Sequence, residues 1–143
     1  MQQLSETDLT MFRTDIMKVL KIFYEKKANN CTSIAALIKI TTDENGGIKD
    51  LVISDNLNST DLAELSLSIS TLELKSFKNL VKNKRLFSST LLLPIYILIE
   101  AEGCPDQKFG DIQIQRYSSF GGKNFSGAAF WFEPVGLKIK RNY

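Results

Sequence analysis

Carboxylates are the chemically useful groups that come closest together in this sequence, and they could bind calcium or act as general acids and bases. The four in question are Asp43, Asp50, Asp55 and Asp61. An EF-hand loop that began at Asp43 would need glycine at its sixth position, but Ile48 stands there. Turn or helix-cap roles account for each of the four carboxylates. The sequence therefore predicts no metal site.

Catalytic groups of other kinds are also missing. The 143 residues include no histidine, which is the usual group for proton transfer near neutral pH and the commonest metal ligand. This absence excludes Ser-His-Asp and Cys-His catalysis and His-bound zinc, copper and haem. Ser66, Ser68 and Ser70 have no base nearby in the sequence that would activate a nucleophile. We therefore expect no enzyme activity and no cofactor.

The middle of the chain carries five basic residues with no acidic residue between them. They are Lys75, Lys78, Lys82, Lys84 and Arg85. Lys82, Lys84 and Arg85 are candidates for a phosphate-binding patch. A basic helix end explains them more simply, because cations are favoured at the negative end of the helix dipole. We favour the helix end, since only Phe77 and Phe87 accompany these charges as aromatic platforms.

Two cysteines, Cys31 and Cys104, complete the set of reactive side chains. Neither has a second sulfur at metal-ligand spacing, so we expect no zinc or iron–sulfur site. They are either buried thiols, as is usual in a reducing cytosol, or partners in a disulfide formed in an oxidising compartment. The residue types alone leave both alternatives open.

The framework that must position these groups is one soluble domain over residues 1–143. A chain of 16.1 kDa buries roughly two-thirds of its unfolded surface on folding. Its 18 basic and 16 acidic residues are too balanced to require a polyanionic partner. No apolar run reaches the roughly 20 residues that span a bilayer, and the segment MQQLSETDL lacks the features of a signal peptide. We expect a cytosolic protein, or an exported one whose signal has been removed.

Two amphipathic helices are predicted. The first covers residues 7–28, where apolar residues recur at steps of three and four. These residues are Leu9, Phe12, Ile16, Val19, Leu20 and Phe23. The second covers residues 59–82, and Asp61 and Glu64 form a capping box at its start.

Three strands are predicted. Alternating apolar residues over 34–41 and 48–54 flank an Asn45–Gly46 turn, which predicts a β-hairpin. Residues 90–101 form a third strand that is apolar on both faces. Pro94 interrupts it and cannot donate a hydrogen bond, so this strand belongs at a sheet edge or at a bulge. The helices can cover one of its faces; the other needs the C-terminal segment or a second chain.

The last part of the chain is rich in aromatic residues separated by glycines. Its aromatic residues are Phe109, Tyr117, Phe120, Phe125, Phe130, Trp131, Phe132 and Tyr143. Residues 111–117 alternate like a strand, and residues 137–139 could form another. The tail either packs over the open face of the sheet or stacks against single-stranded nucleic acid. We favour packing.

These elements predict an α+β fold in the order helix, β-hairpin, helix, edge strand. A hairpin followed by a helix and a strand is a split βαβ unit. The three strands then form an antiparallel sheet of order 2-1-3, which places the third strand at an edge. The aromatic extension is free to add further strands.

The succession of motifs resembles a known family. An apolar strand is followed by Asp43 and Asn45–Gly46 in a turn, then by a second strand that begins with the β-branched Ile48. A capped helix, a basic loop and a strand with a Pro94–Ile95 step come next. This order resembles the C-terminal domain of TonB-type energy transducers over residues 36–100.

The resemblance implies a non-enzymatic protein-binding module of the bacterial cell envelope. Residues 31–104 would form the TonB C-terminal-like core, and residues 105–143 an aromatic, glycine-rich extension packed on it. A protein or extended peptide would pair with the edge strand by β-augmentation. The residues expected at this edge are Leu92, Pro94, Tyr96 and Leu98.

Other consequences of the resemblance concern assembly and location. A second copy of the chain could occupy the same edge and form a homodimer. The location would be periplasmic or in the cell envelope if the resemblance holds, and cytoplasmic otherwise. Family members carry an N-terminal membrane anchor and a proline-rich spacer, whereas this sequence has three prolines and neither feature. We therefore expect an adaptor built on the same scaffold.

The alternative function is a small binder of single-stranded nucleic acid or of phosphate. It would use Lys82, Lys84, Arg85 and the aromatic tail. We rank nucleic acid below protein as a partner, since the charge is balanced and the tail contains no RNP-type motif.

The predicted topology also bears on the cysteines. If the first and third strands are antiparallel neighbours, Cys31 and Cys104 fall at the same end of the sheet. In an exported protein they would then pair and close a loop of roughly 74 residues, a disulfide worth about 4 kcal/mol.

Overall fold

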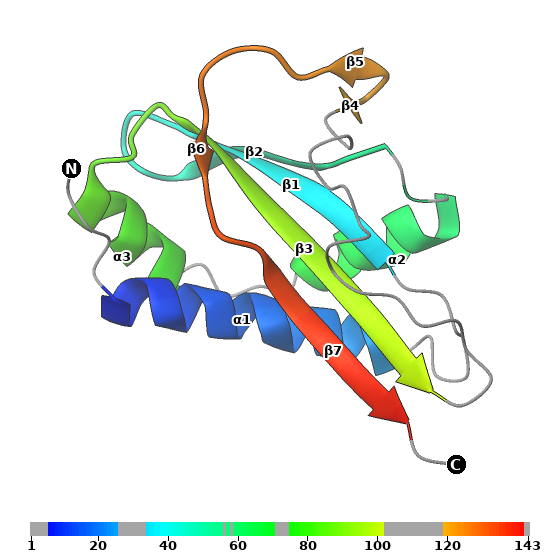
Figure 1. Ribbon diagram of the computed structural model, residues 1–143. Coiled ribbons are helices and arrows are strands. Elements are labelled where there is room, and N and C mark those ends of the chain that lie inside the picture. The colour runs from blue at the N-terminus through cyan, green and yellow to red at the C-terminus, as the bar shows by residue number, and fades with distance from the viewer. Residues whose placement is uncertain are drawn as a thin grey trace.

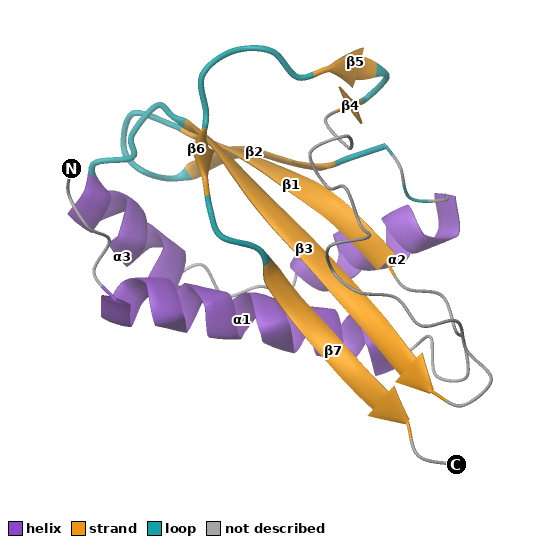
Figure 2. Ribbon diagram, in the orientation of Figure 1, coloured by secondary structure: helices purple, strands orange, loops and turns teal. Residues whose placement is uncertain are grey.

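The part of the chain that the structure describes contains three helices, a mixed sheet and a separate two-stranded antiparallel hairpin of β4 and β5. The structure is a computed structural model, and it describes residues 6–25, 34–55, 57, 59–70, 75–101 and 119–141. The helices are α1 (Glu6–Glu25), α2 (Ser59–Ser70) and α3 (Lys75–Lys84). The strands are β1 (Ile34–Thr42), β2 (Ile48–Ile53), β3 (Thr90–Ala101), β4 (Ser119–Phe120), β5 (Lys123–Asn124), β6 (Phe130–Trp131) and β7 (Val135–Arg141). The predicted α+β class is confirmed (Figure 2).

The region predicted as one helix over residues 59–82 contains two helices. α2 ends at Ser70, and α3 begins at Lys75. Serine is a weak helix former because its hydroxyl competes for backbone groups. The Ser70 hydroxyl does this at the end of α2, where it donates to the backbone carbonyl of Leu67.

The turn between β1 and β2 is organised by Asp43. Its Oδ1 accepts the N–H of Asn45 at 2.8 Å and the N–H of Gly47 at 2.9 Å. Gly46 has a φ of +87°, a left-handed conformation that glycine adopts without steric cost. The turn role predicted for Asp43 is therefore confirmed, because its carboxylate binds its own loop.

β1 lies between β2 and β3 and is antiparallel to both, so the predicted order 2-1-3 is confirmed (Figure 1). The far side of β3 is not an edge, however. β6 and β7 run parallel to β3 and pair with it in succession, and the Phe132 N–H donates to the Leu92 carbonyl at 2.9 Å. The prediction that residues 90–101 form an edge strand is wrong, because the chain's own tail supplies the next strand.

Pro94 fits inside the sheet because of where its nitrogen points. It lies opposite Leu37 in the β1–β3 register. The Leu37 N–H donates to the Ser54 hydroxyl and the Leu37 carbonyl accepts the Ser54 N–H, each at 2.9 Å. Both backbone groups of Leu37 therefore point away from β3, and Leu37 and Pro94 form a non-hydrogen-bonded pair. The Pro94 nitrogen consequently faces the other side of β3, where the partner strand is interrupted between Trp131 and Val135. The donor that proline lacks is not needed at this point.

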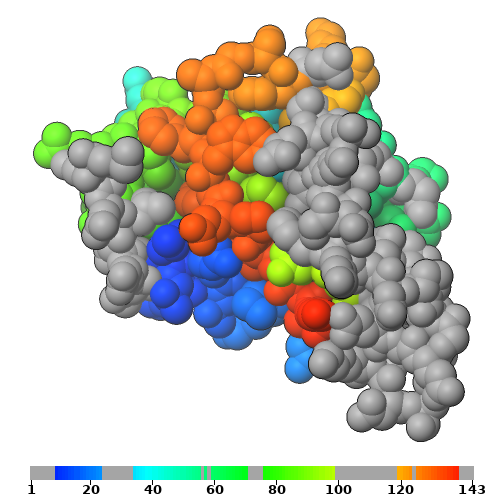
Figure 3. Space-filling model, in the orientation of Figure 1, coloured from blue at the N-terminus to red at the C-terminus, as the bar shows by residue number. Residues whose placement is uncertain are grey.

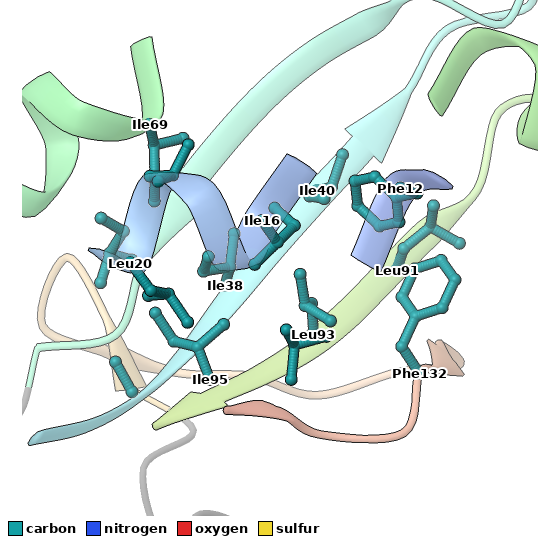
Figure 4. Packing of buried hydrophobic residues seen from close by; sticks show 14 of the residues in the cluster. Phe12, Ile16, Leu20, Ile38, Ile40, Ile69, Leu91, Leu93, Ile95 and Phe132 are labelled. Atoms are coloured by element: carbon teal, nitrogen blue, oxygen red, sulfur yellow. The ribbon is translucent and has the colours of Figure 1, made fainter. Parts of the chain in front are cut away.

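The larger core lies between the helices and one face of the sheet (Figure 4). α1 contributes the predicted apolar stripe, and Phe12, Phe23 and Leu20 are almost fully buried. The sheet contributes alternate residues of each strand, as a period of two requires. From β1 and β3 these are Ile34, Ala36, Ile38, Ile40, Leu91, Leu93, Ile95 and Ile97.

The aromatic tail covers part of the opposite face. Phe120 is buried there with Leu37 and Leu92, and Phe125 and Ala129 pack against the same cluster. The Lys39 ammonium lies 5.0 Å from the centre of the Phe120 ring, within the range of a cation–π contact. The tail therefore packs on the sheet as predicted. Residues 137–139 form part of β7, whereas residues 111–117 lie outside the described part of the chain.

Gly136 allows this packing where β7 meets β3. It is paired with Tyr96 across the two strands. A Cβ atom placed on Gly136 would overlap with the ring of Tyr96. The absence of a side chain at residue 136 is therefore what leaves room for the tyrosine ring.

Gly136→Ala should destabilise the protein by about 1–3 kcal/mol, the usual cost of overpacking. The cost should become small in the background of Tyr96→Ala, because the ring that blocks the new methyl group is then absent. Urea unfolding of the four proteins of this double-mutant cycle measures both quantities. An equal cost in the two backgrounds would show that the Tyr96 ring does not occupy the space above Gly136.

Candidate functional site

The four residues predicted to contact a partner lie inside the sheet. Leu92, Pro94 and Leu98 are buried, and Tyr96 is half-buried beside Gly136. β3 is paired with β1 on one side and with β6 and β7 on the other. An added peptide has no access to the backbone of β3 while the tail occupies that side.

On this side of the sheet, the strand formed by β6 and β7 is the free edge, and β2 forms the opposite edge. Within the described residues, no strand pairs with the outer side of β7. The N–H and C=O groups on the outer side of such an edge strand can pair with another chain. In Figure 3, the orange and red surface of these strands lies beside the blue surface of α1.

Two aromatic side chains flank this edge. Phe130 is 56% exposed and Trp131 is 52% exposed. Phe130 pairs with Leu91 and Trp131 with Leu92, whose side chains lie on the helix-covered and the opposite face respectively. The two rings therefore lie on either face of the edge. Their sequence signal was the run of three aromatic residues at 130–132, which does not separate exposed rings from the buried Phe132.

The strand interruption next to these rings is held by α1. The Arg13 guanidinium donates to the carbonyls of Glu133 at 3.1 Å and Pro134 at 2.9 Å. The Phe132 ring is buried, with its centre 5.6 Å from that of Phe12. Burial of such a ring is worth roughly 1.5–3 kcal/mol. Arg13 carries no local sequence signal for this role, because the carbonyls that it binds lie about 120 residues away.

The other end of the tail is attached to Asp55. Its carboxylate accepts the Gly122 N–H at 2.7 Å, the Ser119 hydroxyl at 3.0 Å and the Gly121 N–H at 2.9 Å. These bonds hold the pKa of Asp55 below its usual value, with the Gly122 bond the largest cause. Asp55 thus connects the end of β2 to the β4–β5 hairpin.

The three residues of the predicted basic patch do not all line the same hollow. Lys82 lines a hollow of about 450 Å³ together with Lys78, and the hollow lies between α3 and the β1–β2 turn. Lys84 is half-buried and does not line it, since two residues correspond to roughly 200° around a helix. Arg85 follows the helix in an exposed turn with a φ of 53°. Only one of the three predicted ligands therefore faces the hollow.

Several further expectations concern sites or segments that the sequence singled out. In the described part of the chain, no group of carboxylates, cysteines or histidines is arranged to hold a metal ion. None of the described helices is long and apolar enough to cross a membrane. Cys31 and Cys104 lie outside the described residues, so their pairing stays a prediction.

Comparisons with known proteins identify no relative. No protein-family model, curated protein or solved structure matches the chain. The fold and the outer edge formed by β6 and β7 therefore provide the basis for the function proposed below.

Acidification should release the β4–β5 hairpin. The folded-state pKa of Asp55 lies below its ordinary value of 3.8, so its contribution to tail docking is complete above that value and is lost as the pH falls below it. The amide resonances of Gly121 and Gly122 should therefore move below about pH 4, as followed by NMR.

In Asp55→Asn, these two amides should occupy shifted positions at neutral pH and should no longer titrate. Asp50→Asn is a matched control, because Asp50 is an exposed acid of β2. If the Gly122 amide titrated alike in wild type and Asp55→Asn, the assignment of Asp55 as the tether would be wrong.

Proposed function

We propose that this chain is a non-enzymatic protein-binding module that accepts an extended peptide as an additional strand on the outer edge of β7. One observation carries the proposal: this edge has no described partner strand and is flanked by the exposed Phe130 and Trp131. Main-chain hydrogen bonds would supply affinity, and the two rings would contact side chains of the peptide. The mode of binding is the β-augmentation expected for β3, but the peptide pairs with β7, the next strand outward.

Charge favours an acidic peptide. β7 has the sequence VGLKIKR, with basic residues at 138, 140 and 141 and no acidic residue. Opposite charges on directly paired residues of neighbouring strands are each worth about 0.2–1 kcal/mol, and like charges opposite one another are destabilising. The same argument disfavours a homodimer in which two copies of β7 pair with each other.

The order of elements supports the proposed relation to the TonB C-terminal domain. A hairpin, a helical segment and a third strand follow one another as in the motif order on which that resemblance rests, and the strands assemble in the order 2-1-3. The tail strands are an addition to this scaffold. Because they pair with β3, the unpaired backbone groups on that side of the sheet belong to β7. Periplasmic or envelope location depends on the resemblance and stays a prediction.

Binding can be tested with a synthetic peptide of alternating glutamate and valine, titrated into the full chain and followed by NMR. We expect shifts at the backbone amides of β7 and at the Trp131 indole. A peptide in which lysine replaces glutamate should bind between about threefold and a hundredfold more weakly, given up to three charge pairs.

Two further measurements separate strand addition from other contacts. Trp131→Ala should weaken binding, whereas Leu67→Ala removes an exposed apolar side chain of α2 that is 61% exposed and should have no effect. Two N-methylated peptides can be compared, each methylated on one of the two alternate sets of backbone nitrogens. The peptide whose methylated nitrogens face β7 should not bind, because it lacks the main-chain donors. If the shifts appeared only on β2, or if the N-methylated peptides both bound normally, strand addition at β7 would be excluded.

A further inference from the structure

The hollow beside α3 is separate from the proposed peptide edge. The β1–β2 turn forms one wall, with Asp43, Asn45, Gly46 and Gly47. Lys78, Asn79 and Lys82 of α3 form the opposite wall, and Phe87 closes one side. β2 and β7 lie on opposite edges of the sheet, so the two surfaces can be tested independently.

The β1–β2 turn is hydrogen-bonded to the segment that follows α3. The Ser88 N–H donates to the Asp43 carbonyl at 3.0 Å, and the Thr42 N–H donates to the Ser89 carbonyl at 2.9 Å. The Thr42 hydroxyl also donates to the Leu86 carbonyl at 2.6 Å. The turn and the segment after α3 therefore form one unit, which fixes the turn wall of the hollow.

Phe87 belongs to this unit although it remains partly exposed. A Cβ atom on the buried Gly46 would come within 3.1 Å of the Phe87 ring and 3.3 Å of Val81. The ring therefore lies against the turn, while 37% of the side chain is exposed. Such a ring offers an apolar surface to a ligand in the hollow.

The hollow contains groups of both signs. Lys78 and Lys82 are exposed and lie one helical turn apart, so their ammonium groups can approach the same anion. The Asp43 carboxylate lies opposite and uses Oδ1 for two backbone N–H groups. The side-chain amides of Asn45 and Asn79 can both donate and accept hydrogen bonds. A suitable ligand must therefore carry an anion and also hydrogen-bond donors.

We propose that this hollow binds a small soluble phosphorylated polyol, in the chemical class of the sugar phosphates. Lys78 and Lys82 bind the phosphate as point charges. Hydroxyl groups of the ligand donate to Asp43 and exchange hydrogen bonds with Asn45 and Asn79, and the carbon skeleton lies against Phe87. Inorganic phosphate has fewer O–H donors than a phosphorylated polyol and no carbon skeleton to lie against Phe87, and the volume of about 450 Å³ lies in the range of small-molecule sites.

The test uses glucose 6-phosphate, glucose and inorganic phosphate as probes, each titrated into the full chain and followed by NMR at about 0.15 M salt, where distant charges are screened. Glucose 6-phosphate should shift the amides of residues 43–47 and 78–82 and should bind at least about tenfold more tightly than either fragment. Absence of shifts at millimolar concentration would overturn the proposal, and so would equal binding of inorganic phosphate.

Matched lysine variants locate the anion. Lys78→Gln and Lys82→Gln should each weaken binding at least about tenfold, whereas Lys84→Gln, on the same helix but outside the hollow, should bind as wild type does. An equal loss in Lys84→Gln would indicate attraction by net charge and would overturn the site. Retention on vesicles containing phosphorylated inositol lipid that free glucose 6-phosphate does not reverse would also contradict a soluble ligand.

Discussion

The parallel pairing of the tail with β3 is the interaction on which the rest of the structure depends. β6 and β7 convert a three-stranded antiparallel sheet into a mixed sheet and make β3 an internal strand. The tail also contributes Phe132 and Val135 to the helix-side core, while Gly136 leaves room for the Tyr96 ring on the opposite face. The same pairing decides which backbone is free to bind a partner, so fold and proposed function share one cause.

Contacts distributed over the chain hold the tail in place. The Arg13 guanidinium satisfies the two carbonyls at the strand interruption, and Asp55 binds the β4–β5 hairpin. Contacts between segments so far apart in the sequence carry a cost in loop-closure entropy. Burial of Phe132 and Val135 in the helix-side core helps to offset that cost.

The strands of the core could be predicted from the sequence because the decisive signals there are local. Alternation around Asn45–Gly46 predicted the hairpin, and strand order followed from chain connectivity. Pro94 favours an edge position, since its missing donor has no place in a regular ladder. Its actual accommodation depends on a strand interruption about 40 residues later, which no local pattern reveals. Likewise, the composition predicts that the aromatic residues of the tail pack on the sheet. It does not show which of them are buried, and only the assembled sheet distinguishes the buried Phe132 from the exposed Trp131.

Hydrogen exchange of the β3 amides tests the central claim most directly. Because the Leu92 carbonyl faces the tail and strand residues alternate, the amides of Tyr96 and Leu98 face β7, whereas those of Leu93 and Ile95 face β1. The structure predicts that all four exchange slowly, with protection that reflects opening of the core. Fast exchange at Tyr96 and Leu98 together with slow exchange at Leu93 and Ile95 would show that β3 is an edge strand and would contradict this account.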